Sequence, residues 1–259
     1  MVDGVLLPWH ALFTMEEQIP FPVRINRYLA LRGLTTRKAA DGLIASGRVL
    51  VNGKPAELGM KVNEEDAVEV QGEVRSKPYR YFAYYKPRGI ITHSPVKREK
   101  SIADIYPEKG VFPIGRLDKA SEGLIILTDD GRVTERLLHP RFVHEKEYEV
   151  VLQEVVPTNT PEKLVRGIES EGERLHAKQV KITSRFELSI VLIEGKKHQI
   201  RRMLSALHLT VKELKRIRIM DIQIGTLIPG EGRQLGHGEE DAFLLALGLS
   251  SKPSLKQHS

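Results

Sequence analysis

The spacing of apolar residues in the first third of the chain predicts two short helices. Residues 24–31 repeat their apolar positions on one helical face, and Gly33 follows as a stop signal. A second helix is predicted to start at a threonine cap, Thr35 or Thr36, and to run to about Ala45. Arginines stand near the starts of both predicted helices.

Strand spacing follows the two predicted helices. Val49–Val51 is a short apolar run, and the pair Asn52–Gly53 directly after it is a strong signal for a tight turn. Further strand-like pieces lie near residues 60–62 and 67–70. We therefore expect residues 23–71 to form a small α/β unit, with two helices on a small sheet.

The rest of the chain has mostly strand spacing. Leu124–Leu127 is a continuous aliphatic run typical of a buried strand, and residues 147–152 alternate like a strand with one buried face. Further alternation covers 179–193 and 213–224, and helices are predicted at 130–138, 160–168 and 197–208. Because strands outnumber helices and no crossovers pair them, we predict an α+β fold with a mixed, largely antiparallel sheet.

Composition excludes several classes of protein. The 259 residues include no cysteine, which excludes disulfides and thiolate metal sites and fits a reducing cytoplasm. His139 and His144 are poorly spaced for metal binding, so no metal site and no cofactor are expected. No apolar run approaches the roughly 20 residues that span a bilayer. We expect a cytoplasmic monomer without a membrane partner or signal peptide; a start at Met1 or at Met15 stays open.

Basic residues gather in two segments of the chain. Between Val23 and Lys54, every charged residue except Asp41 is basic. In the second segment, residues 196–218, Glu213 is the only acid. Together with a net charge of +6, this clustering indicates a polyanionic partner, although a solvated charged surface would have the same pattern.

A short polar turn ahead of the most apolar run holds the strongest candidate for chemistry. Gly115 and Gly123 bracket this turn and permit tight backbone geometry. Asp118 lies within it, two residues after Arg116, at the lip of the predicted buried strand. A carboxylate held there is well placed to act as a nucleophile. From these residues alone, a surface ion pair is the plainer alternative.

The first basic segment resembles a known RNA-binding module. The strings RINRYLA (24–30), TRKAA (36–40) and GRVLVNGK (47–54) are similar to the S4-type RNA-binding domain over its full length. Such a domain binds phosphates and contributes affinity with little sequence discrimination. The RNA-facing residues that the resemblance implies are Arg24, Arg27, Arg37, Lys38, Arg48, Asn52 and Lys54.

Three further strings resemble the pseudouridine synthases of the RsuA type, which carry an S4-type domain ahead of the catalytic one. They are FPIGRLD (112–118), HEKEY (144–148) and KHQIRRM (197–203), the last followed by KRIRIM (215–220). Their order and spacing match the family over residues 23–235. The sequence is most similar to the RluF branch, which implies action on large-subunit (23S) ribosomal RNA.

The resemblance implies a role for each matching residue. Asp118 is the implied nucleophile, which attacks either the sugar anomeric carbon or the pyrimidine ring. Arg201 is implied to face Asp118 and keep it ionised, and Tyr148 to stack on the target base, although the strand alone favours a core tyrosine. The implied substrate contacts are Arg116, Gln199, Ile200 and Arg202.

The implied reaction isomerises a uridine to pseudouridine without a metal, redox partner or cofactor. The N-glycosidic bond breaks, the base turns, and the base rejoins the sugar through carbon. A base within RNA must first be flipped out at a cost of about a few kcal/mol, which stacking and backbone contacts recover. Some of the basic residues of segment 196–218 are expected to hold phosphates that flank the flipped nucleotide.

Several alternatives remain open. A noncatalytic RNA-binding or ribosome-assembly protein would use the same basic segments, and a nucleoside glycosidase would use Asp118 with Glu122. Within the family, small-subunit ribosomal RNA is an alternative substrate and transfer RNA a possible second one. A departure from the family pattern stands at Gly232, where a terminal motif usually has tryptophan, so packing near that edge is hard to predict.

The motifs divide the chain into five expected segments. They are an N-terminal extension (1–22), the S4-type domain (23–71), a polar linker (72–79), the pseudouridine synthase catalytic domain (80–248) and a disordered tail (249–259).

Overall fold

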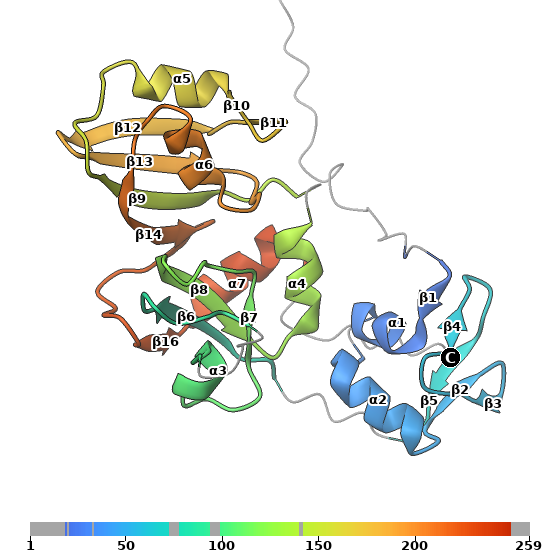
Figure 1. Ribbon diagram of the computed structural model, residues 1–259. Helices are drawn as coiled ribbons and strands as arrows, with labels where there is room; N and C mark the ends of the chain where they lie inside the picture. The colour runs from blue at the N-terminus through green and yellow to red at the C-terminus, as the bar shows by residue number, and fades with distance from the viewer. Residues whose placement is uncertain are drawn as a thin grey trace, which may run out of the picture. The chain divides into compact units, whose positions relative to one another are not determined.

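Two units make up the fold, Met1–Ser76 and Lys77–Ser259 (Figure 1). The computed structural model describes residues 19, 21–32, 34–72, 78–93, 99–139 and 142–249, but not the side chain of Lys38. The predicted stop at Gly33, most of the extension and tail, and part of the linker therefore lie outside the described residues.

Helices and short strands share one core in the first unit. Its elements are β1 (Val23–Arg24), α1 (Ile25–Leu31), α2 (Arg37–Ala45), β2 (Val49–Val51), β3 (Lys54–Pro55), β4 (Lys61–Val62) and β5 (Val68–Val70). Strand β1 pairs with β4, and the other strands form a sheet in the order β3-β2-β5. Ile25 and Leu29 of α1 pack with Ile44 of α2 and Val49 of β2, so the two predicted helices and their apolar faces are confirmed.

Local hydrogen bonds explain where these elements start and turn. The Thr36 hydroxyl caps α2 by accepting from the backbone of Ala39 at 3.2 Å. Asn52 and Gly53 both have positive φ, 50° and 74°, as a tight hairpin turn requires. The Asn52 amide donates to Asp66 Oδ1 at 2.8 Å and accepts from Ala67 N at 2.9 Å. Asn52 therefore holds its turn against the start of β5, and because it is exposed its RNA contact stays a prediction.

The second unit is built on a mixed sheet. Its elements are β6 (Tyr81–Lys86), α3 (Ile102–Ile105), β7 (Phe112–Ile114), β8 (Glu122–Thr128), α4 (Gly131–Leu138), β9 (Lys146–Leu152), α5 (Thr160–Arg166), β10 (Ile168–Ser170), β11 (Glu173–Leu175), β12 (Gln179–Ser184), β13 (Glu187–Leu192), α6 (Gln199–Ser205), β14 (Val211–Ile219), β15 (Ile222–Gln223), β16 (Gly232–Gln234) and α7 (His237–Ala246).

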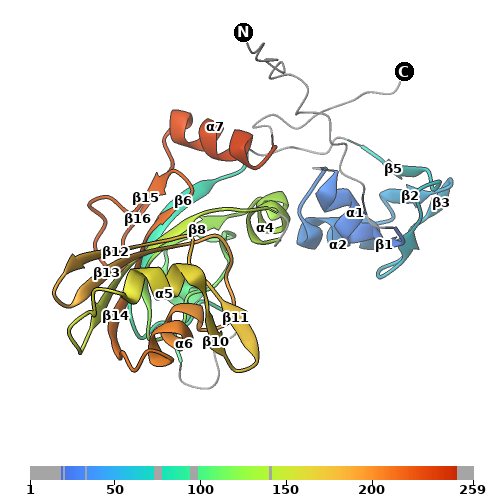
Figure 2. The same cartoon turned by 90° about the horizontal axis from the view of Figure 1, so that it is seen from above.

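The order of the main sheet confirms the predicted fold class. The strands run β12-β13-β9-β14-β8-β6-β16, with β15 beside β14 and β7 beside β8. Among the strands that the structure describes in this sheet, only β14 and β8 pair in parallel. Helices α5 and α6 lie on one side of the sheet and α7 on the other (Figure 2).

Burial on both faces explains why β6 and β8 read as continuous apolar runs. Every residue of β6 is buried, because Tyr81, Ala83 and Tyr85 pack with α4 and α7 while Phe82 and Tyr84 pack with α3. The other half of the sheet has its own core, which α5 and α6 cover. The Asp118 loop lies where these two halves meet.

A backbone contact at Gly123 joins the two halves of the sheet. Gly123 on β8 is the register partner of Arg216 on β14 and has a φ of 108°, which favours glycine. A Cβ atom at this position would lie 2.3 Å from the carbonyl oxygen of Arg216. Only glycine therefore lets the strands meet here, and β8 runs on beside β7 instead of β14.

The C-terminal part of the unit differs from expectation. Helix α7 was not predicted, because its N-cap is Gly236 and no side-chain cap marks its start. Leu249, assigned to the tail by sequence, packs against the core formed with α7. At Gly232 the Tyr106 ring fills the space, since a Cβ would lie 2.8 Å from its Cε2 atom.

Within the described residues, no helix combines the length and apolar character that a bilayer crossing requires.

Candidate active site

Asp118 stands on the loop between β7 and β8, and hydrogen bonds fix the backbone on both sides of it. The buried Thr92 hydroxyl accepts from Leu117 N at 3.1 Å and donates to Leu117 O at 2.8 Å. On the other side, Ser121 N donates to the carbonyl oxygen of Asp118 at 3.0 Å. The carboxylate is thus presented from a backbone that is already organised for it.

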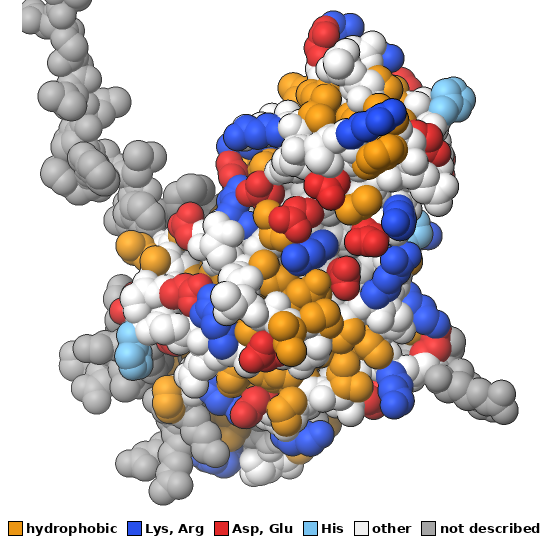
Figure 3. Space-filling view, turned by 90° about the vertical axis from the view of Figure 1, so that its left-hand side faces the viewer, with side chains coloured by type: hydrophobic (Ala, Val, Ile, Leu, Met, Phe, Trp, Pro, Cys, Tyr) orange, Lys and Arg blue, Asp and Glu red, His pale blue; other side chains and the backbone are white. Residues whose placement is uncertain are grey.

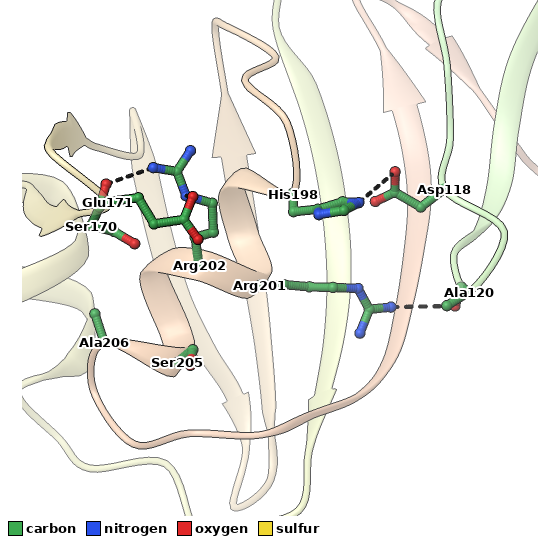
Figure 4. A pocket seen from close by; sticks show the side chains of 9 residues that line it. All are labelled: Asp118, Ala120, Ser170, Glu171, His198, Arg201, Arg202, Ser205 and Ala206. Carbon is green, nitrogen blue, oxygen red and sulfur yellow. Dashed lines mark hydrogen bonds and ion pairs between the residues drawn. The ribbon is translucent and has the colours of Figure 1, made fainter.

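The Asp118 side chain is accessible and faces a histidine. It is 40% exposed, and its Oδ1 atom lies 3.4 Å from Nε2 of His198 (Figure 4). His198 occupies the N-cap position of α6, and its φ of 52° lies in the left-handed region. Sequence analysis did not single out His198, although it stands within the KHQIRRM string.

Arg201 reaches the Asp118 loop, but not through the ion pair that we expected. Among the described residues, no ion pair joins the two side chains. The guanidinium instead donates to Ala120 O at 3.3 Å and to Ser121 Oγ at 3.4 Å, as Figure 4 shows in part. Burial lowers the pKa of Arg201, whereas the charge of Asp118 acts to raise it. Arg201 and Asp118 are therefore near neighbours. Arg201 holds the Asp118 loop through the Ala120 carbonyl and the Ser121 hydroxyl.

Two cavities meet at Asp118. The larger, of about 820 Å³, extends to Tyr148 and Ile200, while the smaller, of about 590 Å³, lies between α6 and the turn of β10 and β11. Asp118, His198 and Arg201 line both cavities. The larger one is big enough for a nucleoside, because small-molecule sites measure about 300–1,000 Å³.

Tyr148 and Ile200 are core residues that also face the larger cavity. They are 8% and 3% exposed and belong to the cluster that α5 and α6 cover. Tyr148 is thus a core tyrosine that also borders the cavity, and its stacking on a base stays a prediction. An accessible carboxylate beside an apolar wall and an aromatic ring suits covalent chemistry on a planar, uncharged group.

Similarity to known proteins decides the family. A family model described as RNA pseudouridylate synthase matches residues 80–206, and the S4 domain model matches residues 23–68. An uncharacterized RNA pseudouridine synthase of Aquifex aeolicus is 42% identical over 245 residues, which cover 89% of this chain and 97% of the relative. The chain belongs to the RNA pseudouridine synthase family. It is an isomerase with an N-terminal S4 RNA-binding domain.

Other relatives of this pseudouridine synthase agree. The dual-specificity RNA pseudouridine synthase RluF of Escherichia coli is 35% identical, with 90% of this chain and 83% of RluF covered. Ribosomal large subunit pseudouridine synthase B of Bacillus subtilis is also 35% identical, with 82% and 91% covered. A crystal structure of a pseudouridylate synthase superposes with a TM-score of 0.64 at 27% identity, covering 85% of this chain and 99% of the other.

Gln199 of the synthase does not have the free amide that substrate binding needs. The residue is 3% exposed. Its Nε2 donates to His176 O at 3.1 Å and to Glu194 Oε1 at 2.7 Å, and its Oε1 accepts from Lys196 N at 3.1 Å. Gln199 therefore fixes the turn ahead of α6, and its substrate contact stays a prediction.

Arg202 has protein partners as well, and its substrate contact stays a prediction. It forms ion pairs with Glu173 at 2.7 Å and Glu171 at 3.2 Å, and its side chain is only 12% exposed. It thus ties α6 to the turn of β10 and β11. Arg116 differs: it is exposed, lines the larger cavity and makes no hydrogen bond or ion pair with any other described residue. Arg116 is therefore available to substrate.

Basic residues of the S4 domain lie largely at its surface. Arg24, Arg37 and Lys54 are exposed, and Arg27 is partly exposed. Arg48 donates through Nε to Gln71 O at 2.9 Å, which fixes its stem, and the Lys38 side chain lies outside the described residues. The surface expected to meet RNA thus retains most of its cations.

The basic residues of the second segment differ in their surroundings. Arg218 pairs with Glu147 at 2.9 Å and Glu145 at 3.0 Å, Lys215 lies 3.5 Å from Glu149, and Arg216 is buried. Acidic and basic side chains alternate on the face in Figure 3, with hydrophobic ones between them. Part of the segment is therefore paired with acids, whereas Lys197 and Lys212 are exposed, so the expected phosphate contacts stay a prediction.

Sequence reasoning missed residues that hold the Asp118 loop from a distance. The buried Lys86 amine donates to Pro87 O at 2.8 Å and Ile90 O at 2.7 Å, which fixes the turn after β6. Gly89 N in that turn donates to Lys119 O at 2.7 Å, next to Asp118. A lysine closing an otherwise apolar strand was the available signal, since lysine is rarely buried without a purpose.

Proposed function

We propose that this synthase isomerises a uridine in ribosomal RNA, with Asp118 as the nucleophile, and that its substrate is the 23S RNA of the large subunit. The observation that carries the proposal is the Asp118 carboxylate, which is 40% exposed at the junction of two cavities on a fixed backbone. The Bacillus subtilis relative is named for the large ribosomal subunit, which supports the choice of RNA.

The cavity supplies what a flipped uridine needs. Tyr148 provides an aromatic face for stacking, and Ile200 provides an apolar surface beside it. Asp118 attacks the nucleoside at the sugar anomeric carbon or at the pyrimidine ring, and the glycosidic bond breaks. Tyr148 is also the group best placed to take the ring proton after the carbon bond forms.

Charged groups outside the cavity hold the RNA. Arg116 lies at the cavity with no protein partner among the described residues, so it contacts a flanking phosphate or fills the gap left by the flipped base. In the S4 domain, the exposed Arg24, Arg37 and Lys54 add affinity through phosphates.

Replacing Asp118 tests the nucleophile. Asp118→Asn removes the attacking charge with little change in volume, so pseudouridine formation should fall below detection while RNA affinity stays within about threefold. The measurement is single-turnover conversion of 23S transcript, with binding measured in parallel. Glu122→Gln is the matched control, because Glu122 has a chemical role only if the protein is a glycosidase. Near-normal turnover by Asp118→Asn would remove the assignment.

Mapping pseudouridines tests the choice of RNA. Cellular RNA with and without this protein should differ at a site in 23S RNA. A difference confined to 16S RNA would contradict that choice. The name of the Escherichia coli relative, dual-specificity, is a reason to map transfer RNA in the same samples.

A further inference from the structure

Two cations, the buried Arg216 and the half-buried Lys146, line the larger cavity without an acidic partner among the described residues. Arg216 on β14 is 4% exposed, and its Nε donates to Leu124 O at 2.7 Å. One of its terminal nitrogens is buried and has no hydrogen-bond partner among the described residues. Lys146 on β9 donates to His144 O at 3.1 Å, and neither cation forms an ion pair with a described residue.

The sheet register brings these cations beside Tyr148. Arg216 lies directly opposite Tyr148 in the antiparallel pair of β14 and β9, so the two side chains share a face. Lys146 precedes Tyr148 by two residues and is therefore on that face as well. All three residues line the cavity that Asp118 enters.

An unpaired charge removed from water is unfavourable for folding, and here a buried and a half-buried cation face the same cavity. Burial, together with the charge of Arg216, lowers the pKa of the Lys146 amine to about 8. The acids nearest in sequence are taken up elsewhere, because Glu145 and Glu147 pair with Arg218. A pair of cations that the protein itself does not neutralise is expected where a substrate supplies the negative charge.

The reaction produces such a charge on the base. When Asp118 attacks the anomeric carbon, an ester C–O bond forms, the C–N bond breaks, and its electron pair stays on N1 and spreads to O2 and O4. When C5 then attacks the anomeric carbon, the ester bond breaks and its electron pair returns to Asp118. The proton lost from C5 balances the one gained by N1. Attack on ring carbon C6 instead pushes the C5–C6 electron pair onto O4, so both routes make an anionic ring.

We propose that Lys146 and Arg216 form a cationic floor that stabilises the negative charge of the uracil ring while the base is being transferred. The proposal rests on the proposed function, since it requires the target base to enter the Asp118 cavity. Groups already organised around a developing charge stabilise it without reorganising during the reaction. The two cations act on the base, whereas Arg201 holds the nucleophile loop.

A substrate with a more stable base anion tests this role. RNA carrying 5-fluorouridine at the target position gives such an anion, because fluorine withdraws electron density. Lys146→Met should slow single-turnover consumption of uridine by about 100-fold or more, the usual loss on removing one such group. The loss on 5-fluorouridine should be several-fold smaller. Lys146→Arg and Arg216→Lys keep the positive charge, so each should lose less of the single-turnover rate than Lys146→Met.

Two other outcomes separate rival explanations. An equal loss on both substrates would overturn the proposal. Weaker RNA binding with an unchanged single-turnover rate would also overturn it, because the cations would then hold a phosphate. Lys212→Met is the matched control: it removes an exposed cation from β14, the strand that carries Arg216, and should leave the ratio of the two rates unchanged.

Stability distinguishes this role from a structural one. If the charge serves catalysis, Lys146→Met should leave the melting temperature unchanged or raise it, because an uncompensated buried charge is removed. A fall of several degrees together with an equal loss on both substrates would indicate a structural lysine. Asp118→Asn is assayed alongside. If that variant keeps activity, the proposed nucleophile fails, while the substrate contrast for Lys146→Met still reports on the cationic floor.

Discussion

The basic residues of segment 24–54 lie mainly at the surface of the S4 domain, whereas those of segment 196–218 are mostly taken up inside the catalytic unit. Arg24, Arg37 and Lys54 are exposed, but Arg202 and Arg218 are bound to glutamates. The two segments look alike in the sequence. We therefore expect a cation to serve RNA affinity best where the fold leaves it exposed and without an acidic neighbour.

The largest expected effect contrasts two adjacent arginines of α6. Arg201→Met removes the hydrogen bonds to the Asp118 loop, and a displaced nucleophile should lower kcat by about 100-fold. Arg202→Met should leave kcat within about threefold, since its partners belong to the turn of β10 and β11. Single-turnover rates on one RNA check both. Equal losses would show that Arg202 also serves the site.

A smaller effect is expected when the surface cations of the S4 domain are removed. Replacing Arg24, Arg37 and Lys54 by alanine should weaken RNA binding and reduce the slope of log affinity against log salt by about 2, given about 0.7 per phosphate contact. Conversion of bound RNA should proceed at its normal rate. Binding titrations at several salt concentrations make the measurement, and an unchanged slope would contradict the role of this surface.

The smallest effect concerns stability and its dependence on pH. Arg218 holds the pKa of Glu147 below the ordinary value of 4.5. A lowered carboxyl pKa contributes stability above the ordinary value, and that contribution is lost as the pH falls through the folded pKa. Arg218→Met should therefore lower stability by about 1 kcal/mol at neutral pH, and less at pH 3. Thermal unfolding at several pH values measures this; a constant difference would show that the ion pair is not the cause.

Local signals predicted much of the fold. Thr36 caps α2, Asn52–Gly53 makes a hairpin, and Leu124–Leu127 is a buried strand, because each depends on neighbours within a few residues. The family resemblance placed Asp118, Tyr148 and Ile200 around one cavity. These predictions rest on local turn and cap residues, on apolar runs and on the order of motifs, all of which can be read from the sequence itself.

Side-chain partners from distant segments could not be predicted. Gln199 bonds to His176, and Arg202 pairs with Glu173, because the turn of β10 and β11 folds against α6. No spacing rule joins Thr92 to Leu117 either, although this pair positions the nucleophile loop. A sequence motif therefore named the residues near the site, but not which of them have their hydrogen bonds already satisfied.

The contact at Gly123 has a consequence for the architecture of the reaction. Asp118 approaches from the β8 half of the sheet, while Tyr148 and Arg216 belong to the other half. The missing side chain of Gly123 sets how close the two halves come, because its α-carbon lies against the Arg216 backbone. On the proposed mechanism, the hydrogen atom in place of a side chain at Gly123 lets Asp118 and Tyr148 face one cavity. A methyl group at this position would push β8 and β14 apart and widen that cavity.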